Sequence, residues 1–286
     1  MTFKNLQATV LTFALASGIL IGCGGEVEQE ENVAENSSEI KIGMLMNLNA
    51  SENEVDELYR KIDKKSGVKL FNHKTIYYEN LPALEMGIAS NKIQEITTYK
   101  CVADYLIGKT NKFEVSHKHQ LRLQDNFCFA FLKDKANLKT EFNKALGELK
   151  ADGTLEKLTK KYVADLNPNQ EPAAVNFQRF DGAETIKVAV TGDLPPLDLI
   201  LPNGDAAGFS TALLAEIGKR LQKNFELVDI DSGAREIALT SGKVDAVFWA
   251  IQPSDEERPA DIDMPADVEL SVHYFADEII HINLKK

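Results

Sequence analysis

The sequence predicts an α/β protein with two lobes, each built on an open sheet with helices beside it. Short apolar strands alternate with amphipathic helices along most of the chain, which is typical of open α/β sheets. A polar stretch with prolines, Asn167–Ala174, divides this pattern into two blocks. The length of 286 residues is enough for two such blocks, and 44% hydrophobic and 27% charged residues are ordinary for a globular protein.

The N-terminal segment has the features of a secretory signal, predicted for residues 1–22. Lys4 is followed by an apolar run from about Val10 to Ile21, which is too short to indicate a membrane span. The run ends in Leu20–Cys23, which resembles a bacterial lipobox. This resemblance implies cleavage before Cys23 and lipidation of its thiol, so that acyl chains hold the protein at a membrane. An ordinary signal peptide with an incidental cysteine is the alternative.

Residues 23–39 are acidic and nearly free of apolar side chains, which predicts a disordered tether. The net charge of the whole chain is −12, and removal of residues 1–22 takes away one lysine, so the mature charge is −12 − 1 = −13. An acidic chain gives no electrostatic support for a nucleic-acid partner. We therefore expect no nucleic acid, and we expect no cofactor.

The first block, residues 40–165, is predicted to begin with the apolar strand Ile40–Met46. Ser51 and Glu54 form a capping box, which predicts a helix with Val55, Leu58, Tyr59 and Ile62 on one face. Further strands are expected at Lys74–Glu79, Ile93–Thr98, Phe113–Ser116 and Phe127–Leu132, and helices at Leu81–Ser90 and Cys101–Ile107.

The end of the first block reads like the end of a domain. A strong helix is predicted over Leu138–Lys150 because Leu138, Phe142, Ala145, Leu146 and Leu149 form one apolar stripe. Gly153 is a natural stop for it, and Thr154 can cap a short second helix. Yet more than a hundred residues follow.

The second block, residues 185–286, follows a linker at residues 166–184. It opens with an expected strand at Ile186–Val190 and an irregular stretch at Pro195–Pro196. The remaining elements are a helix at Phe209–Leu221, a strand at Phe225–Asp229, a helix at Ala234–Thr240, a turn into a strand at Ser241–Val247, and a strand at Tyr274–Asn283. Asp245 is expected to fix that turn.

Cysteine and histidine give no strong site. Cys101 and Cys128 could form a disulfide in an exported chain, although apolar neighbours favour a buried free thiol at Cys128. His117 and His119 share a face of an expected strand, but no third ligand lies nearby, so we expect solvated residues and no metal.

Four segments of the second block resemble the opening half of type 3 periplasmic solute-binding proteins of ABC transporters, which typically bind amino acids. These segments are a strand with a Pro loop, a Gly-rich turn, a Leu-x-x-Gly-Lys-x-Asp-Ala motif, and a Ser-x-Pro-Tyr-like segment: Lys187–Pro196, Asn203–Phe209, Ala238–Val247 and Ser271–Phe275. The resemblance implies a fold of two lobes that close about a hinge, and it implies no enzymatic activity.

Residues 40–163 resemble the other half of this family. Leu84–Leu106 is similar to part of the second lobe, and Phe127–Val163 is similar to the final strand and C-terminal helices. The simplest interpretation is a circular permutation, with the lobes in reversed order and residues 166–184 bridging the old ends. Two truncated copies in tandem are the alternative, but each would bury little apolar surface and have no cleft.

The resemblance implies ligand-binding positions in both lobes. Arg258 matches, with an offset of about one residue, the arginine that pairs with a ligand carboxylate; a surface arginine is the alternative. Leu194 and Leu197 stand where the family has aromatic residues. Tyr99 stands where the family has an aspartate for the ligand's amino group, and a phenol cannot balance an ammonium group as a carboxylate does. An ordinary α-amino acid is therefore open to question.

Other candidates come from segments expected to face the cleft. Trp249 could supply the missing aromatic wall or pack in the core, and Gln252 follows it. Asn49 and Ser51 could present donors to an anion at a helix start, although capping alone explains Ser51. Asp193 could contact the ligand or only its own loop.

The sequence thus predicts a lipid-anchored binding protein in the cell envelope, facing the periplasm or exterior. Its partners would be a small polar metabolite, an amino acid or related carboxylate, and an ABC permease. A sensory or degenerate module that acts through a protein partner is the first alternative. A dehydratase-like enzyme is the second; it would need an acid–base pair, for which Asp193, Glu257 and His273 are the candidates.

Overall fold

The computed structural model describes residues 39–46, 73–116, 123–167, 172–253 and 265–286, together with 56–57, 60, 64 and 169. The predicted signal, most of the tether, the capping box at Ser51 and the histidines His117 and His119 lie outside these residues. Residues Ser38–Lys286 form one compact unit.

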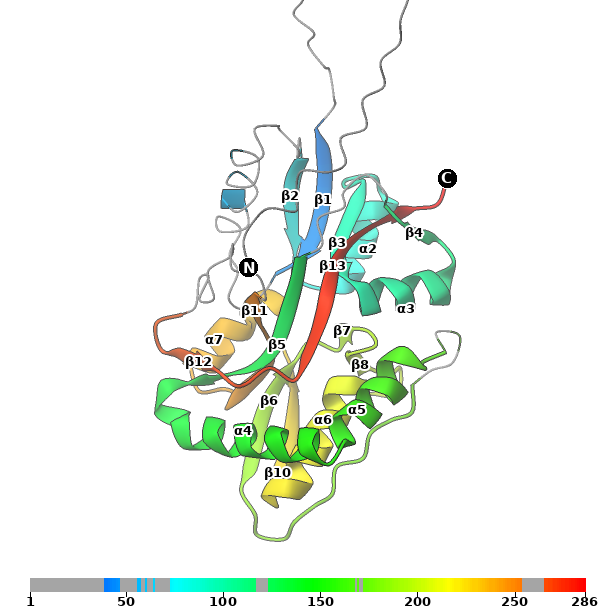
Figure 1. The fold of residues 1–286 in the computed structure, drawn as a ribbon. Coiled ribbons are helices and arrows are strands. Elements are labelled where there is room, and N and C mark those ends of the chain that lie inside the picture. Colours follow the sequence, from blue (N-terminus) through cyan, green and yellow to red (C-terminus); the bar gives the residue numbers. More distant parts are fainter. Residues whose placement is uncertain are drawn as a thin grey trace, which may run out of the picture. The chain divides into compact units, whose positions relative to one another are not determined.

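The described strands of this unit build one mixed sheet and a small three-stranded sheet. The strands are β1 Ile40–Leu45, β2 His73–Tyr78, β3 Glu95–Tyr99, β4 Phe113–Val115, β5 Leu123–Leu132, β6 Thr185–Val190, β7 Asp193–Leu194, β8 Asp198–Ile200, β9 Ala206–Ala207, β10 Asn224–Asp229, β11 Ala246–Pro253, β12 Val268–Leu270 and β13 Phe275–Leu284. The large sheet runs in the order β10-β6-β11-β5-β13-β3-β1-β2, with β12 beside β5 and β4 beside β13, while β7, β8 and β9 form the small one (Figure 1).

Two long antiparallel strands in the middle of this sheet connect two parallel groups. The first group, β1 with β2 and β3, is parallel, and so is the second, β6 with β10 and β11. Strands β5 and β13, of ten residues each, pair with each other, while β5 also pairs with β11 and β13 with β3. The predicted α/β class with two lobes is therefore confirmed. We call β1–β4 with their helices lobe A, the group around β6 lobe B, and β5 with β13 the hinge strands.

Helices cover both lobes, with bounds close to those predicted from periodicity. They are α2 Leu81–Ala89, α3 Lys100–Thr110, α4 Ala136–Ala151, α5 Thr154–Thr159, α6 Phe209–Leu221 and α7 Arg235–Thr240. Helices α4 and α5 come from the first sequence block but contact α6 of lobe B. Phe142 of α4 lies fully buried against Phe129 and Phe131 of β5 and Phe225 of β10, so the two blocks share one core.

Some local predictions differ from the structure. Strand β5 begins at Leu123, four residues earlier than expected. Thr154 does not cap α5 with its side chain; instead Oδ1 of Asp152 accepts the backbone N–H of Thr154 at 2.9 Å, while Gly153 adopts a φ of 76° that disfavours residues with a Cβ atom. The linker is also packed in part, since the side chain of Asn224 holds the backbone of Phe180.

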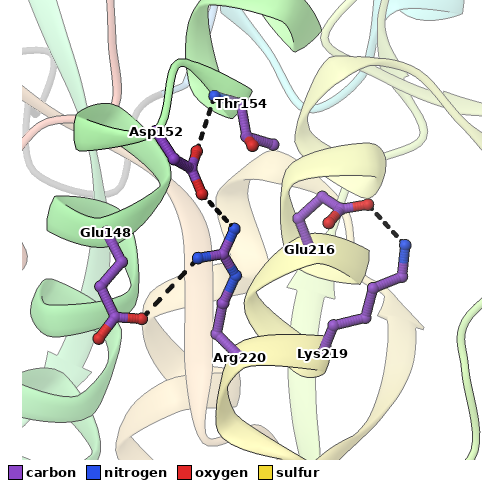
Figure 2. Close-up of polar contacts among 6 residues, drawn as sticks. All are labelled: Glu148, Asp152, Thr154, Glu216, Lys219 and Arg220. Atoms are coloured by element: carbon purple, nitrogen blue, oxygen red, sulfur yellow. Dashed lines mark hydrogen bonds and ion pairs between the residues drawn. The ribbon is translucent and has the colours of Figure 1, made fainter.

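An exposed network joins the turn after α4 to α6 (Figure 2). Arg220 of α6 donates to Asp152 at 2.5 Å and lies 4.0 Å from Glu148, and Lys219 pairs with Glu216 at 2.6 Å. Hydrogen bonds from Thr154 and Arg220 hold the pKa of the Asp152 carboxyl well below its ordinary value. Because these groups are solvated, they orient the turn and contribute little to stability.

Candidate functional site

A small cavity of about 40 Å³ lies where the two lobes meet the hinge strands. Lobe A lines it with the ends of β1 and β3, lobe B with Leu194 and Trp249, and the hinge strands with Asp125 and Ile279. Typical ligand pockets measure about 300–1,000 Å³, so this cavity is much smaller than a small-molecule site. Among the described residues, the space at the centre of the cleft is therefore small.

The cavity brings together three residues that the sequence singled out, Tyr99, Leu194 and Trp249. The Tyr99 ring packs edge-on against Phe127, with centroids 4.6 Å apart, and against Trp249, with centroids 6.0 Å apart. Its hydroxyl donates to Oδ2 of Asp125 at 3.0 Å. Tyr99 therefore anchors a buried carboxylate of the chain at the position where the family resemblance implied a carboxylate of its own.

Trp249 packs in the core and also borders the central cavity. It is 2% exposed and belongs to the hydrophobic core, and it also lines the cavity. Its indole Nε1 is buried and has no hydrogen-bond partner among the described residues. A buried donor without a partner is costly, so this N–H is available to a ligand acceptor or a water.

Arg235 is a fully buried cation beside this wall, and the sequence analysis did not single it out. Its guanidinium stacks on the Trp249 ring at 4.5 Å and donates to the Trp249 carbonyl at 3.0 Å. It also donates to the carbonyl of Met46 in lobe A at 2.9 Å and to that of Ser232 at 3.2 Å. Arg235 thus connects Met46 of lobe A with Trp249, which borders the central cavity from lobe B.

The other predicted residues are not brought to this cavity. Leu197 is 1% exposed and lies in the core. Gln252 is partly buried and lies opposite Asn126 in the sheet. The backbone of Asp193 begins β7, and its side chain lies outside the described set. Arg258, Asn49, Ser51 and Cys23 also lie outside the described residues.

A larger cavity, of about 430 Å³, lies beside the Pro loop. The first residues of α3 line it, together with Pro196 of lobe B, Asp277 of hinge strand β13, and Val163, Ala164 and Leu166. Typical ligand pockets measure about 300–1,000 Å³, so this cavity has the size of a small-molecule site.

The structure also places Asp245, the two cysteines and His273. The Asp245 carboxylate accepts the backbone N–H of Lys187 at 2.9 Å, which joins the end of the turn to strand β6. Cys101 and Cys128 are buried free thiols, and burial raises the pKa of Cys128 to about 12. His273 is exposed and lines neither cavity. Within the described ranges, no three histidine, cysteine or acidic side chains are grouped as metal ligands.

Comparison with family models gives one match. Residues 186–275 match the model of bacterial extracellular solute-binding proteins, family 3. The match runs from β6 to the first residue of β13, so it covers lobe B up to the hinge and confirms the resemblance for that part of the chain. No protein with a curated description is matched.

Solved structures of binding proteins align over most of the chain at low identity. A ligand-binding component of an ABC-type import system from Staphylococcus aureus aligns over 85% of this chain and 65% of its own, with 11% identity and a TM-score of 0.43. A nutrient-binding protein from Burkholderia cenocepacia bound to methionine covers 85% and 84%, with 11% identity and a TM-score of 0.39. The GluR0 ligand-binding core from Nostoc punctiforme with L-glutamate covers 86% and 85%, with 12% identity and a TM-score of 0.38.

No helix in the described part of the chain combines the length and the apolar character needed to cross a bilayer.

Proposed function

We propose that this chain is an extracytoplasmic solute-binding protein of the ABC-import type. It would close its lobes around a small polar metabolite, an amino acid or a related carboxylate, and present the closed form to a membrane permease. The observation that carries this proposal is the position of the family 3 match, whose residues form most of lobe B and end at the hinge strand β13. Binding proteins of two lobes take their ligands between the lobes, where both cavities of this chain lie.

The order of the lobes supports a circular permutation. Ile42 near the start of β1 lies opposite Glu95 of β3, and Ile282 near the end of β13 lies opposite Ile96 on the other side of β3. Two strand spacings, about 10 Å, therefore separate these two segments. A link between Lys286 and Glu39 would restore the family order, and permutation is tolerated where such ends are close.

The small volume at the centre of the cleft fits a protein that opens to take up its solute. Hinge motion of two lobes changes the space between them without unfolding either lobe. Both hinge strands run from one lobe to the other, so rotation about β5 and β13 would widen the cavity beside Trp249. Binding energy would then favour the closed form over the open one.

We propose, as the sequence predicts, that Cys23 carries the lipid and that residues 23–39 tether the folded unit to the membrane. Replacement of Cys23 by serine should release the mature protein from the membrane fraction of the producing cell. Retention of the Cys23→Ser variant at the wild-type level would contradict this anchor.

A second candidate function, a module that acts through a protein partner, is favoured by one observation. The central cavity has a volume of only about 40 Å³, and the Tyr99 hydroxyl beside it already donates its hydrogen bond to Asp125. A cleft filled by its own side chains would suit a degenerate binding protein. The fluorescence experiment described next separates the two functions.

Trp249 is the single tryptophan of the chain, so the intrinsic emission reports directly on the cleft. We expect that one class of amino acids, dipeptides or organic acids shifts this emission and raises the melting temperature. At a concentration of 100 Kd a ligand stabilises the folded state by about 2.7 kcal/mol. A panel that changes neither signal would favour the partner module, and chemical turnover of a bound compound would favour the enzyme.

A further inference from the structure

The two ends of the large sheet are joined directly by a hydrogen bond. Strands β10 and β2 stand at opposite ends of the strand order, with the hinge strands in the middle. In a flat sheet, seven strand spacings of about 4.8 Å would separate these ends by about 34 Å. Yet the backbone N–H of Ser232, shortly after β10, donates at 3.0 Å to the carbonyl of Glu79, the residue that follows β2. The lobes therefore meet at the points that lie farthest from the hinge strands in the sheet order.

Two further hydrogen bonds cross between the lobes beside this one. Nδ2 of Asn80 donates to Oδ1 of Asp231 at 3.4 Å, and the guanidinium of Arg235 donates to the carbonyl of Met46 at 2.9 Å. Gly233 packs so closely on lobe A that a Cβ atom there would lie 3.0 Å from Sδ of Met46. We call these residues the latch: Met46, Glu79 and Asn80 in lobe A, and Asp231, Ser232, Gly233 and Arg235 in lobe B.

Local structure positions both halves of the latch. Asn80 is the N-cap of α2, and its Oδ1 accepts the backbone N–H of Ala83 at 3.0 Å, so Oδ1 serves the helix while Nδ2 faces lobe B. Ser232 begins the 3₁₀-helix η3, Ser232–Ala234, and the first N–H of a helix has no partner inside that helix. Each half therefore offers the other lobe a donor that its own helix does not use.

We propose that the latch is a gate at the mouth of the cleft. It holds the lobes together without a solute, and a small molecule reaches the central cavity only when the latch opens. All its donors and acceptors belong to the chain, so none of its bonds needs a solute to form. Rotation about the hinge strands separates such distant partners first. This inference rests on the proposed solute-binding function and adds the device that controls entry.

Acrylamide quenching of Trp249 in the full chain tests the gate without any solute. This single tryptophan is 2% exposed and lines the central cavity, so a neutral quencher reaches it mainly when the lobes part. Ser232→Pro removes the N–H that bonds to Glu79, while proline suits the first position of a helix and the extended backbone of Asp231 before it. We expect the quenching constant to rise at least about twofold, since one hydrogen bond shifts a two-state equilibrium by about two- to tenfold.

Ser232→Ala is the matched control for the proline variant. It keeps the backbone N–H and removes only a buried hydroxyl that has no hydrogen-bond partner among the described residues. Its quenching constant should therefore equal that of the wild type. A rise as large as that of Ser232→Pro would overturn the inference, because the hydrogen bond between the lobes would then not be the cause.

An exchange across the latch tests the gate from the other lobe. Asn80→Asp keeps the cap of α2 but faces Asp231 with a second carboxylate. Quenching should rise at low salt and return toward the wild-type value at 1 M salt, where the Debye length is about 3 Å. The double variant Asn80→Asp with Asp231→Asn exchanges donor and acceptor and should restore the wild-type value at low salt.

The outcomes separate the gate from the proposed function. Wild-type quenching in Ser232→Pro or in Asn80→Asp, or no restoration in the double variant, would overturn the gate while leaving solute binding intact. A solute screen in which no compound binds would overturn the proposed function, whatever the quenching shows.

Discussion

Replacement of Phe142 by alanine is expected to lower the free energy of unfolding by about 3–5 kcal/mol. The ring is fully buried, and its centroid lies 5.2 Å from that of Phe129, 5.0 Å from that of Phe131 and 5.9 Å from that of Phe225. Truncation would leave a cavity inside this aromatic cluster and remove edge-to-face contacts on three sides. Urea denaturation monitored by circular dichroism measures the change.

The Phe142 variant also tests whether the two sequence blocks share one core. Phe142 belongs to the first block and Phe225 to the second, so the variant should still unfold in a single transition at a lower urea concentration. Phe142→Leu, which keeps most of the volume, should cost less than about 1.5 kcal/mol. A loss below 1 kcal/mol in the alanine variant, or separate transitions for the two blocks, would contradict the shared core.

Replacement of Arg235 by alanine is expected to destabilise the closed protein by at least about 3 kcal/mol, because each buried polar group left unsatisfied costs about 1–3 kcal/mol. The change would remove the donors to the carbonyls of Met46, Ser232 and Trp249 at 2.9, 3.2 and 3.0 Å. It would also unstack the Trp249 ring, so the emission maximum should move toward that of solvated tryptophan. Lysine should rescue only in part, since it lacks the planar fork of arginine.

Arg220 supplies the matched control for Arg235. It is a solvated arginine that pairs with Asp152 and Glu148, so Arg220→Ala should change neither the stability nor the emission appreciably (Figure 2). If Arg235→Ala melts like the wild type and keeps its emission spectrum, Arg235 does not connect the lobes in solution.

The secondary structure could be predicted where periodicity is strong. Helix α6 has the predicted bounds because its apolar residues repeat with the helical period. The first part of β5 was missed because Gln124, Asp125 and Asn126 are polar and break the apolar run. These residues belong to a hinge strand whose ladder partner, β13, is also interrupted by acidic residues. Polar residues in a strand reduce the strand signal at the place where the strand approaches the cleft.

The candidate site could be predicted only in part, for a similar reason. Comparison of the sequence with the motifs of the family pointed to Tyr99, Leu194 and Trp249, and the fold brings these three residues to one cavity. Asp125 and Asp277 lie opposite each other only because two strands more than a hundred residues apart pair in one register. Nothing local distinguishes either from an exposed acid. Arg235 was missed likewise, since its burial depends on carbonyls from three separate segments.

The central claim is that both sequence blocks together build one binding unit in a reordered chain. The most direct test is a relinked chain that runs from residue 172 to Lys286, then through a glycine–serine linker of about six residues, and then from Glu39 to Asn167. Such a linker reaches about 13 Å, enough for the separation of about 10 Å across β3. We predict one cooperative thermal transition within a few degrees of that of the parent, and unchanged binding of the same solute. A relinked chain that fails to fold, or that unfolds in two transitions, would contradict the claim.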